Sequence, residues 1–315
     1  MDDPLAKYIS EFSDMLVTSE PYMGDDTATQ TGQIVTKTLN SGSVYTARNP
    51  ITIRHLFSMS AGFDYRLDEP AITEAIATGK TTTFDIAKSL AKTVLGFEPG
   101  TRYRYSLCHD VLGALVEIWS GMKLGDYMRA NIFEPLDMQD TFFGVPEDKE
   151  RRLRLAALYV RKNAGLYEKI PPICEFNLTK DYQSGGAGLI SSTKDYALFL
   201  DALACQGLGK TGKRILSPSS IELMRCNQLK DKQLEDFELS RKGYGYGFGV
   251  RTHISPERSA SKSPVGEFGW GGAAGAFSLV DPANKLSLTY FQHMRKWSLN
   301  LEKILRDALY KSIEE

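Results

Sequence analysis

The C-terminal part of the chain has a strand–turn–strand–helix pattern, which constrains the fold more than any other feature of the sequence. Residues 276–280 (Ala-Phe-Ser-Leu-Val) and 286–291 (Leu-Ser-Leu-Thr-Tyr-Phe) read as two strands, joined by the strong turn sequence Asp-Pro-Ala-Asn at 281–284. The segment that follows has apolar residues at helical spacing: Leu301, Ile304, Leu305, Ala308 and Leu309. We therefore predict an antiparallel sheet with the terminal helix packed across it.

The residues upstream of this pattern are mainly helical in character. Apolar spacing and end signals predict helices over residues 51–60, 84–95, 110–119, 124–132 and 193–204, the last capped by Ser192 or Thr193. Two further patterns predict β-structure: a small hairpin from residues 33–39 and 44–47, and an aromatic, glycine-rich strand region over 244–252. The predicted fold class is α+β, in a single domain over residues 1–315. Its mostly helical lobe spans 1–240, and 241–315 holds the sheet strands and the C-terminal helix.

Composition and charge exclude several classes of function. The 38 Lys and Arg residues balance 39 Asp and Glu residues, so there is no positive surplus for gripping nucleic acid. No run of 18 apolar residues predicts a membrane span. The acidic start Met1–Pro4 is no secretory signal and identifies no compartment. Four cysteines are too scattered to form a metal site and read as buried or free thiols: Cys108, Cys174, Cys205 and Cys226. No metal or organic cofactor is implied.

Several short patterns match catalytic motifs only by letter. Residues 207–213 nearly spell a phosphate-binding loop, but Arg214 stands where a magnesium-binding hydroxyl is needed. No Gly-x-Ser-x-Gly elbow is present. Cys108, His109 and Asp110 are adjacent, and neighbours on a helix point in different directions, so they cannot form a hydrogen-bonded relay.

Three segments together carry a resemblance to a known family. They are Gly100–Gly113 (Gly-Thr-Arg-Tyr-Arg-Tyr-Ser-Leu-Cys-His-Asp-Val-Leu-Gly), Ser184–Tyr196 and Gly266–Gly275 (Gly-Glu-Phe-Gly-Trp-Gly-Gly-Ala-Ala-Gly). In this order and spacing the chain resembles the serine β-lactamase-related superfamily of class C β-lactamases, DD-peptidases and esterases, over about residues 2 to 293. The resemblance implies a β-lactamase/transpeptidase-like fold and serine hydrolase chemistry.

The resemblance also implies site residues. Tyr105-Ser106-Leu107 resembles the family's Tyr-x-Asn element, which makes Tyr105 the base that takes the serine proton. Trp270-Gly271-Gly272 resembles its Lys-Thr-Gly element, and the backbone N–H of Ala273 falls where the family places an oxyanion donor. Ser106, Leu107, Trp270, Gly271 and Gly272 are then substrate-binding, while the nearby Tyr103 is a packing aromatic. The implied ligand is a small-molecule ester or acyl compound. Because an indole replaces the cation that would hold a carboxylate, we expect neutral acyl esters to be preferred over penicillins.

One element of the family pattern has no match at its expected place. The Ser-x-x-Lys nucleophile should precede a stretch that resembles residues 2–9 (Asp-Asp-Pro-Leu-Ala-Lys-Tyr-Ile), so the chain is expected to start one helix and two strands late. Literal matches elsewhere fail by context: Ser120 with Lys123, Ser191 with Lys194, Ser259 with Lys262, and Lys210-Thr211-Gly212. Loss of such a nucleophile costs on the order of a million-fold in turnover. A weak or inactive enzyme is therefore expected, with an exposed sheet edge through which the chain could oligomerise.

Two functions follow from these expectations. The first is a serine hydrolase that cleaves esters through an acyl-enzyme and is impaired in this chain. The alternative is a non-catalytic protein that retains the cleft and binds an acyl compound, a peptide or a partner.

Overall fold

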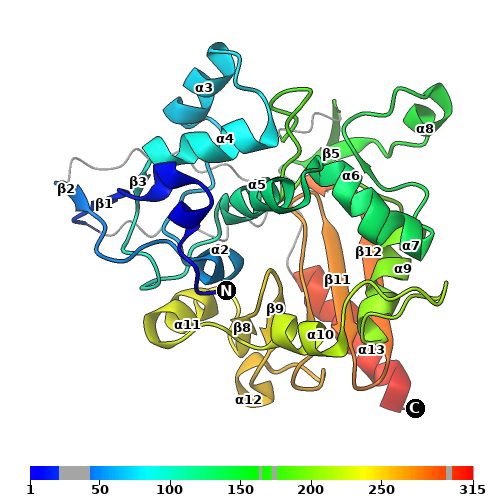
Figure 1. Ribbon diagram of the computed structural model, residues 1–315. Helices are drawn as coiled ribbons and strands as arrows, with labels where there is room; N and C mark the ends of the chain where they lie inside the picture. Colours follow the sequence, from blue (N-terminus) through cyan, green and yellow to red (C-terminus); the bar gives the residue numbers. More distant parts are fainter. Residues whose placement is uncertain (21–42, 163–164, 172–175, 296–299, 315) are drawn as a thin grey trace.

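The computed structural model describes residues 1–20, 43–162, 165–171, 176–295 and 300–314. A five-stranded antiparallel sheet forms one half of the molecule, in the order β12-β11-β10-β9-β8 (Figure 1). Its strands are β8 (Tyr244–Tyr246), β9 (Arg251–His253), β10 (Phe268–Gly269), β11 (Ala276–Asp281) and β12 (Leu286–Phe291). Among the described residues β12 is an edge strand of this sheet.

The predicted hairpin at 276–291 is confirmed. Strands β11 and β12 pair from Ala276 opposite Phe291 to Asp281 opposite Leu286. In the turn, the Asp281 carboxylate accepts hydrogen bonds from the backbone N–H groups of Ala283 and Asn284, at 3.0 and 3.2 Å. The side chain of Asp281 therefore satisfies the turn locally, as expected of an Asp at this position.

The two faces of the hairpin pack against different helices. Because side chains alternate along a strand, Phe277 and Leu279 of β11 face α13 (Asn300–Glu314), whereas Val280 packs in a cluster with α9 (Thr193–Ala204). The prediction of a terminal helix laid across the sheet is thus confirmed.

The buried face of α13 differs from the predicted one. Ile304 is 61% exposed and Ala308 is also exposed, while Glu302, Arg306 and Tyr310 are buried at helical spacing. Glu302 pairs with Arg241 at 3.1 Å, and Arg306 lies 3.5 Å from Glu267. The spacing of apolar residues predicted the helix correctly. Leu305 and Leu309 of the predicted face do pack against the sheet, whereas Ile304 and Ala308 do not. Charged side chains are buried beside them in ion pairs that link distant parts of the chain.

The other half of the molecule is mainly helical. Its α-helices of five or more residues are α2 (Ile53–Phe57), α3 (Pro70–Ala77), α4 (Thr83–Ser89), α5 (Cys108–Ser120), α6 (Leu124–Met128) and α8 (Lys149–Leu153). Two others, α10 (Pro218–Arg225) and α11 (Asp231–Glu238), pack beside the five-stranded sheet. Shorter turns are η1 (Leu5–Lys7), η2 (Ser10–Phe12), η3 (Leu90–Lys92), the π-helical η4 (Arg129–Phe133), α7 (Glu134–Leu136) and α12 (Pro256–Ser259). None of the helices in the described ranges is both long enough and apolar enough to cross a membrane.

Three small sheets complete the architecture. They are β2-β1-β3 (Val44–Thr46, Leu16–Thr18, Val94–Leu95), β13-β5-β6 (Met294–Arg295, Leu158–Arg161, Tyr167–Ile170) and β4-β7 (Phe142–Phe143, Leu189–Ile190). The predicted helix over 84–95 is therefore too long, because its last two residues pair in parallel with β1. The predicted hairpin strand 33–39 lies outside the described residues, so the hairpin stays a prediction; β2 pairs with β1 on one side. Non-local pairing explains why residues 94–95 form a strand.

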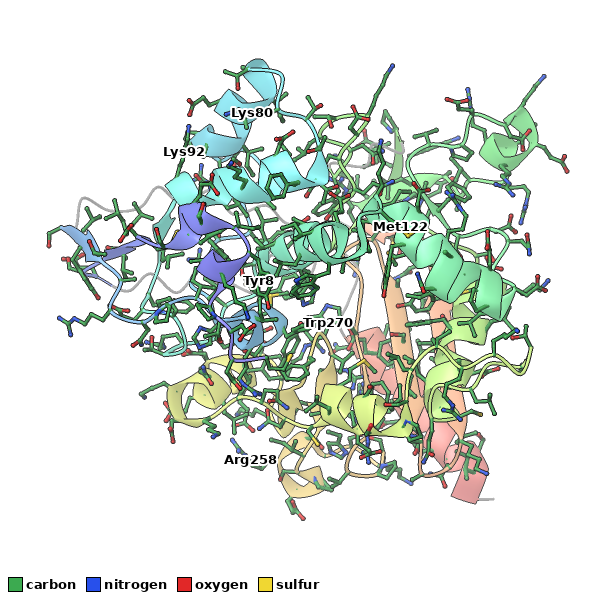
Figure 2. The ribbon with its side chains drawn as sticks, in the orientation of Figure 1. Tyr8, Lys80, Lys92, Met122, Arg258 and Trp270 are labelled. Atoms are coloured by element: carbon green, nitrogen blue, oxygen red, sulfur yellow. The ribbon has the colours of Figure 1, made fainter. Side chains whose placement is uncertain are left out.

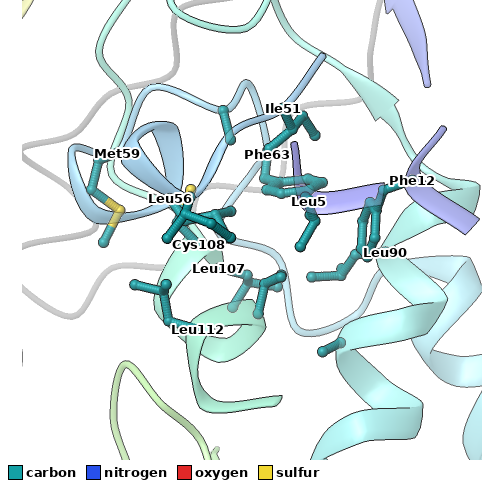
Figure 3. Close-up of a cluster of buried hydrophobic side chains, with 14 of the residues drawn as sticks. Leu5, Phe12, Ile51, Leu56, Met59, Phe63, Leu90, Leu107, Cys108 and Leu112 are labelled. Atoms are coloured by element: carbon teal, nitrogen blue, oxygen red, sulfur yellow. The ribbon is translucent and has the colours of Figure 1, made fainter. Parts of the chain in front are cut away.

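The main hydrophobic core surrounds the first turns of α5. Leu5 and Phe12 from the N-terminal turns, Leu56 from α2 and Leu112 from α5 pack together there (Figure 3). This core holds the start of α5 in place, and the loop that precedes it carries the residues predicted for the functional site. Trp270 lies near the centre of the molecule in the view of Figure 2.

Candidate active site

A cavity of about 1210 Å³ opens between the helical half and the sheet. Its wall is formed by residues of the loop before α5, of the 184–193 segment, of α9 and of the turn after β10. Of the predicted site residues, Tyr105, Trp270, Gly271, Gly272 and Ala273 line this one cavity. Segments more than 160 residues apart in the sequence are thus brought to a common wall.

A column of stacked aromatic rings crosses the cavity wall. The Tyr65 and Tyr105 rings are 5.3 Å apart between centroids and inclined by 27°, and Tyr105 and Trp270 are 5.5 Å apart at 24°. Tyr246 meets Trp270 edge-on at 5.2 Å. Tyr65 was not singled out from the sequence, because nothing local distinguishes it from a core tyrosine.

The extended segment before α5 sets the direction of Tyr105. Arg104 is buried and pairs with Asp64 at 2.7 Å, and its backbone N–H donates to the Met59 carbonyl at 2.9 Å. Tyr103, on one side of this anchor along the chain, lies in the core, whereas Tyr105, on the other side, lines the cavity. Tyr103 is packed against Phe237, which agrees with its predicted role as a packing aromatic.

Tyr105 is a neutral phenol at ordinary pH. Burial raises the pKa of Tyr105 to about 12, and a hydrogen bond with the Trp270 side chain acts in the opposite direction. No lysine lines the described part of the cavity wall, so no ammonium stabilises a phenolate there.

Ser106 and Leu107 do not reach the cavity. The Ser106 hydroxyl points into the core, 3.1 Å from the Cys108 sulfur and 3.9 Å from that of Met59, and Leu107 belongs to the core cluster. The chain turns into α5 at this point, which directs both side chains away from the wall that Tyr105 lines. The structure therefore does not bring these two predicted substrate-binding side chains together with the other five residues.

The turn after β10 presents backbone groups to the cavity. Gly272 and Ala276 close it with a 2.7 Å hydrogen bond, and the Ala273 N–H has no partner among the described residues. A Cβ at Gly271 would lie 2.8 Å from a carboxylate oxygen of Glu302, so a larger residue there would have to displace a carboxylate that is held in an ion pair. The turn thus leaves the Ala273 N–H unpaired among the described residues, while the hydrogen bond between Gly272 and Ala276 closes it and Glu302 packs against Gly271.

A guanidinium lies beside Trp270. The Arg241 side chain stacks on the indole, with its central carbon 5.2 Å from the ring centroid, and it pairs with Glu302 of α13. Both side chains are almost fully buried. Sequence reasoning missed Arg241 because it lies in a loop with no motif around it. Its charge is balanced by Glu302, so the Trp270 wall carries no net charge from this pair.

Asp110 anchors a second wall of the cavity to α5. Its carboxylate accepts hydrogen bonds from the Tyr182 and Ser184 hydroxyls at 2.5 and 2.6 Å. Burial raises the pKa of Asp110, and these hydrogen bonds act in the opposite direction. The segment from Ser184 to Thr193, which lines the cavity, is therefore held against the start of α5.

The adjacent Cys108, His109 and Asp110 point in three directions, as expected. Cys108 is in the core, where burial raises the pKa of its thiol to about 12. His109 lines the cavity, and burial lowers its pKa to about 4, so the imidazole is neutral. Cys205 and Cys226 are free and exposed, whereas Cys174 lies outside the described residues.

Four serines lie on the described cavity wall, and each hydroxyl has a structural partner. Ser184 bonds to Asp110, Ser191 to Thr141, Ser192 caps α9, and Ser278 bonds to the Trp270 backbone. Ser120 ends α5 and bonds back to the Val116 carbonyl. In the part of the chain that the structure describes, no wall serine is paired with a basic side chain. No cluster of metal-ligating residues is found there either.

The comparisons with known proteins concern the family and the fold. The family described as Beta-lactamase matches residues 1–309. Among curated relatives, an uncharacterized protein of Mycobacterium tuberculosis is 30% identical over 212 residues, which are 65% of this chain and 52% of that protein. Esterase EstB of Burkholderia gladioli is 28% identical over 288 residues, which are 82% of this chain and 69% of EstB. The chain thus spans about half the length of the first of these relatives.

Among solved structures, the chain is similar to EstCE1, described as a hydrolase with promiscuous acyltransferase activity. The TM-score is 0.73 at 26% sequence identity, and the match covers 98% of this chain and 78% of EstCE1. The fold is therefore the β-lactamase/transpeptidase-like fold that the sequence predicted.

Proposed function

This chain belongs to the β-lactamase family, and on that premise we propose that its cavity binds neutral acyl esters for acyl transfer to water or to another acceptor. We further propose that turnover by this chain is slow. Esterase EstB and EstCE1 support the class of chemistry, since one is named an esterase and the other a hydrolase with acyltransferase activity.

One observation carries the proposal: Tyr105 and Ala273 line the same cavity, and the Ala273 N–H has no hydrogen-bond partner among the described residues. An N–H donor aimed at a carbonyl oxygen stabilises the negative charge that develops there during acyl transfer. Tyr105 would hold or accept the proton of the attacking hydroxyl. The glycines at 271 and 272 let an ester lie close to the backbone.

The ion pairs of two wall arginines, and of the arginine beside Trp270, support a neutral substrate. Arg104 pairs with Asp64 at 2.7 Å and Arg154 pairs with Asp140 at 2.5 Å, so both cations are already neutralised. The cation beside Trp270 is likewise paired, with Glu302. A substrate carboxylate would have to compete with these carboxylates, whereas a neutral ester would not.

Slow turnover is proposed from the chemistry of the wall. None of its described serines is hydrogen-bonded to a histidine or a lysine, and the Asp110 carboxylate that accepts from Ser184 also accepts from Tyr182. The high pKa of Tyr105 leaves roughly one phenol in a hundred thousand ionised at pH 7. The same features support a second candidate, a non-catalytic protein that binds acyl compounds in the retained cavity. Its specific support is the neutral aromatic column of Tyr65, Tyr105 and Trp270, which offers an apolar surface to a ligand.

The test compares hydrolysis and binding on the same protein. Purified chain is assayed with a p-nitrophenyl ester of a short uncharged acid and with benzylpenicillin, and ester binding is measured by calorimetry. The enzyme proposal expects ester hydrolysis above background, little penicillin hydrolysis, and loss of activity in Tyr105→Phe but not in the control Tyr103→Phe. Binding without turnover would favour the second candidate. Efficient penicillin hydrolysis, or no binding at all, would refute the proposed substrate class.

A further inference from the structure

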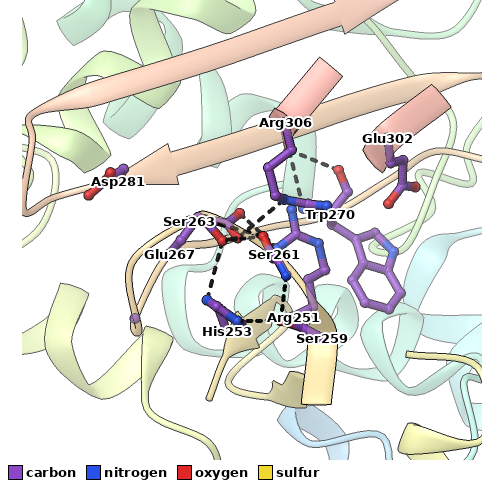
Figure 4. A network of polar contacts seen from close by, with 12 residues as sticks. Arg251, His253, Ser259, Ser261, Ser263, Glu267, Trp270, Asp281, Glu302 and Arg306 are labelled. Atoms are coloured by element: carbon purple, nitrogen blue, oxygen red, sulfur yellow. Dashed lines mark hydrogen bonds and ion pairs between the residues drawn. The ribbon is translucent and has the colours of Figure 1, made fainter. Parts of the chain in front are cut away.

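A serine and a histidine outside the cavity form a hydrogen-bonded pair. The Ser259 hydroxyl, at the end of α12, lies 2.7 Å from Nε2 of His253 in β9 (Figure 4). Neither residue lines the cavity. In the sequence, Ser259 with Lys262 matches Ser-x-x-Lys by letter and fails by context because it lies in a polar loop, and no pattern there points to His253 as its partner.

The surroundings of His253 define which ring nitrogen carries the proton. Nδ1 lies 3.2 Å from the Pro264 carbonyl oxygen, which can only accept a hydrogen bond. In the neutral ring Nδ1 is therefore protonated, and Nε2 has a free lone pair to accept from Ser259. This is the tautomer that a histidine needs to act as a base toward a serine hydroxyl.

A buried carboxylate lies behind this pair. Ser263 contacts Nδ1 of His253 at 3.2 Å and donates to Glu267 at 3.2 Å. Glu267 is fully buried and is paired with the buried Arg251 at 2.8 Å. Ser259, as nucleophile, thus contacts His253, as base, and His253 contacts Ser263. Ser263 in turn links His253 to the Glu267 carboxylate.

Ser259 is open enough to react, whereas its partner is shielded. Ser259 is half-buried, His253 is 0% exposed, and Ser263 is 3% exposed. Ala260, the next residue, has φ of +51°, a left-handed conformation that alanine rarely adopts. The Ser261 N–H donates to the Ser259 oxygen at 3.1 Å. The backbone therefore turns sharply after Ser259 and holds its hydroxyl toward His253.

We infer that Ser259 is an activated nucleophile, a second reactive site that accepts acyl or phosphonyl groups from activated donors. Its oxygen attacks the acyl carbon or phosphorus, the bond from that atom to the leaving group breaks, and the serine proton passes to His253 Nε2 and then to the leaving group. His253 is the base, and Ser263 is a positioning residue that acts through His253.

The experiment uses a fluorophosphonate probe, which forms a serine–phosphorus bond and releases fluoride. The whole chain is labelled, digested, and the adduct is located by mass spectrometry. We expect the adduct on Ser259, its loss in Ser259→Ala, and its retention in the control Ser255→Ala, which removes a serine of the same loop that is half-buried like Ser259 and whose hydroxyl donates to Glu257. Labelling of Ser259 is expected to vanish in concentrated urea, because an unfolded serine has no base beside it.

Two further variants test the roles of the partners. A folded His253→Gln protein should be labelled on the order of a hundredfold more slowly, which is the usual contribution of a general base. Ser263→Ala should slow labelling, and Ser263→Thr should restore it, because threonine keeps the hydroxyl. If His253→Gln does not fold, the comparison of native and urea-treated wild-type protein still tests whether labelling of Ser259 requires the folded site.

Several outcomes would overturn the inference: no adduct on Ser259 in the folded protein, equal labelling of Ser255, or labelling that persists in urea. An adduct on a cavity serine alone would also overturn it, while supporting the enzyme proposal for the cavity. Ester hydrolysis assigned to the cavity must persist in Ser259→Ala, so the two ideas can fail separately.

Discussion

Replacing Arg241 by methionine removes the cation that pairs with Glu302 beside Trp270. The two charges are 3.1 Å apart and both side chains are almost fully buried, so screening by solvent is weak. At an effective dielectric constant of about 20, their attraction is about 5 kcal/mol. Breaking a buried pair from one side usually costs 3–5 kcal/mol, because an unpaired charge is left behind.

We expect a loss near the lower end, about 3 kcal/mol, because Glu302 keeps other cations nearby. Burial opposes ionisation of Glu302, but Arg241, Arg251 and Arg306 together hold the pKa of its carboxyl below its usual value. The methionine also preserves the stacking volume on the indole. The measurement is the free energy of unfolding in urea for Arg241→Met, for Glu302→Gln and for the double variant.

The double variant should recover most of the loss, because it leaves no unpaired charge. The pH dependence has a definite sign. A carboxyl group whose pKa is lower in the folded state stabilises the fold at pH values above the pKa that it has in the unfolded chain. Without Arg241, the folded-state pKa of Glu302 rises. The deficit of Arg241→Met should then be largest at neutral pH and shrink as pH falls below about 4. Additive losses, or a deficit that is constant with pH, would refute the reasoning.

Three other perturbations have expected outcomes. Gly271→Ala places a Cβ 2.8 Å from the Glu302 carboxylate and should destabilise the fold by about 1–3 kcal/mol in urea unfolding, with weakened ester binding in calorimetry. Any ester turnover that depends on the Tyr105 phenolate should rise about tenfold per pH unit up to about pH 12 and be absent in Tyr105→Phe. Burial raises the pKa of Asp110, so the stability that its protonated form contributes is present at low pH and is lost as pH rises through the pKa of the folded state. In Asp110→Asn, the free energy of unfolding should no longer fall over this pH range. Asp110→Ala should lower the free energy of unfolding by about 3 kcal/mol at every pH, because it removes the acceptor of the Tyr182 and Ser184 hydroxyls.

Local patterns in the sequence predicted the elements that depend on neighbouring residues. The helix Thr193–Ala204 has the predicted bounds and the predicted Ser192 cap, because a cap and an apolar spacing act within a few residues. The hairpin at 276–291 was predicted for the same reason, since its turn is satisfied by the Asp281 side chain. Elements that pair with segments far away in the sequence were predicted less well. Residues 94–95, for example, were predicted to end a helix, but they form a strand that pairs with β1.

The sequence alone determined the α+β class, the family resemblance and the positions of Tyr105 and the Trp270–Ala273 turn, because these are carried by residue order and local spacing. Only the tertiary structure decided that Ser106 faces the core, that Arg241 and Glu302 support Trp270, and that Ser259 meets His253. These last contacts join residues whose spacing in the chain follows no helical or strand period. Their partners are chosen by packing and by the need to satisfy buried charge, which no local pattern encodes.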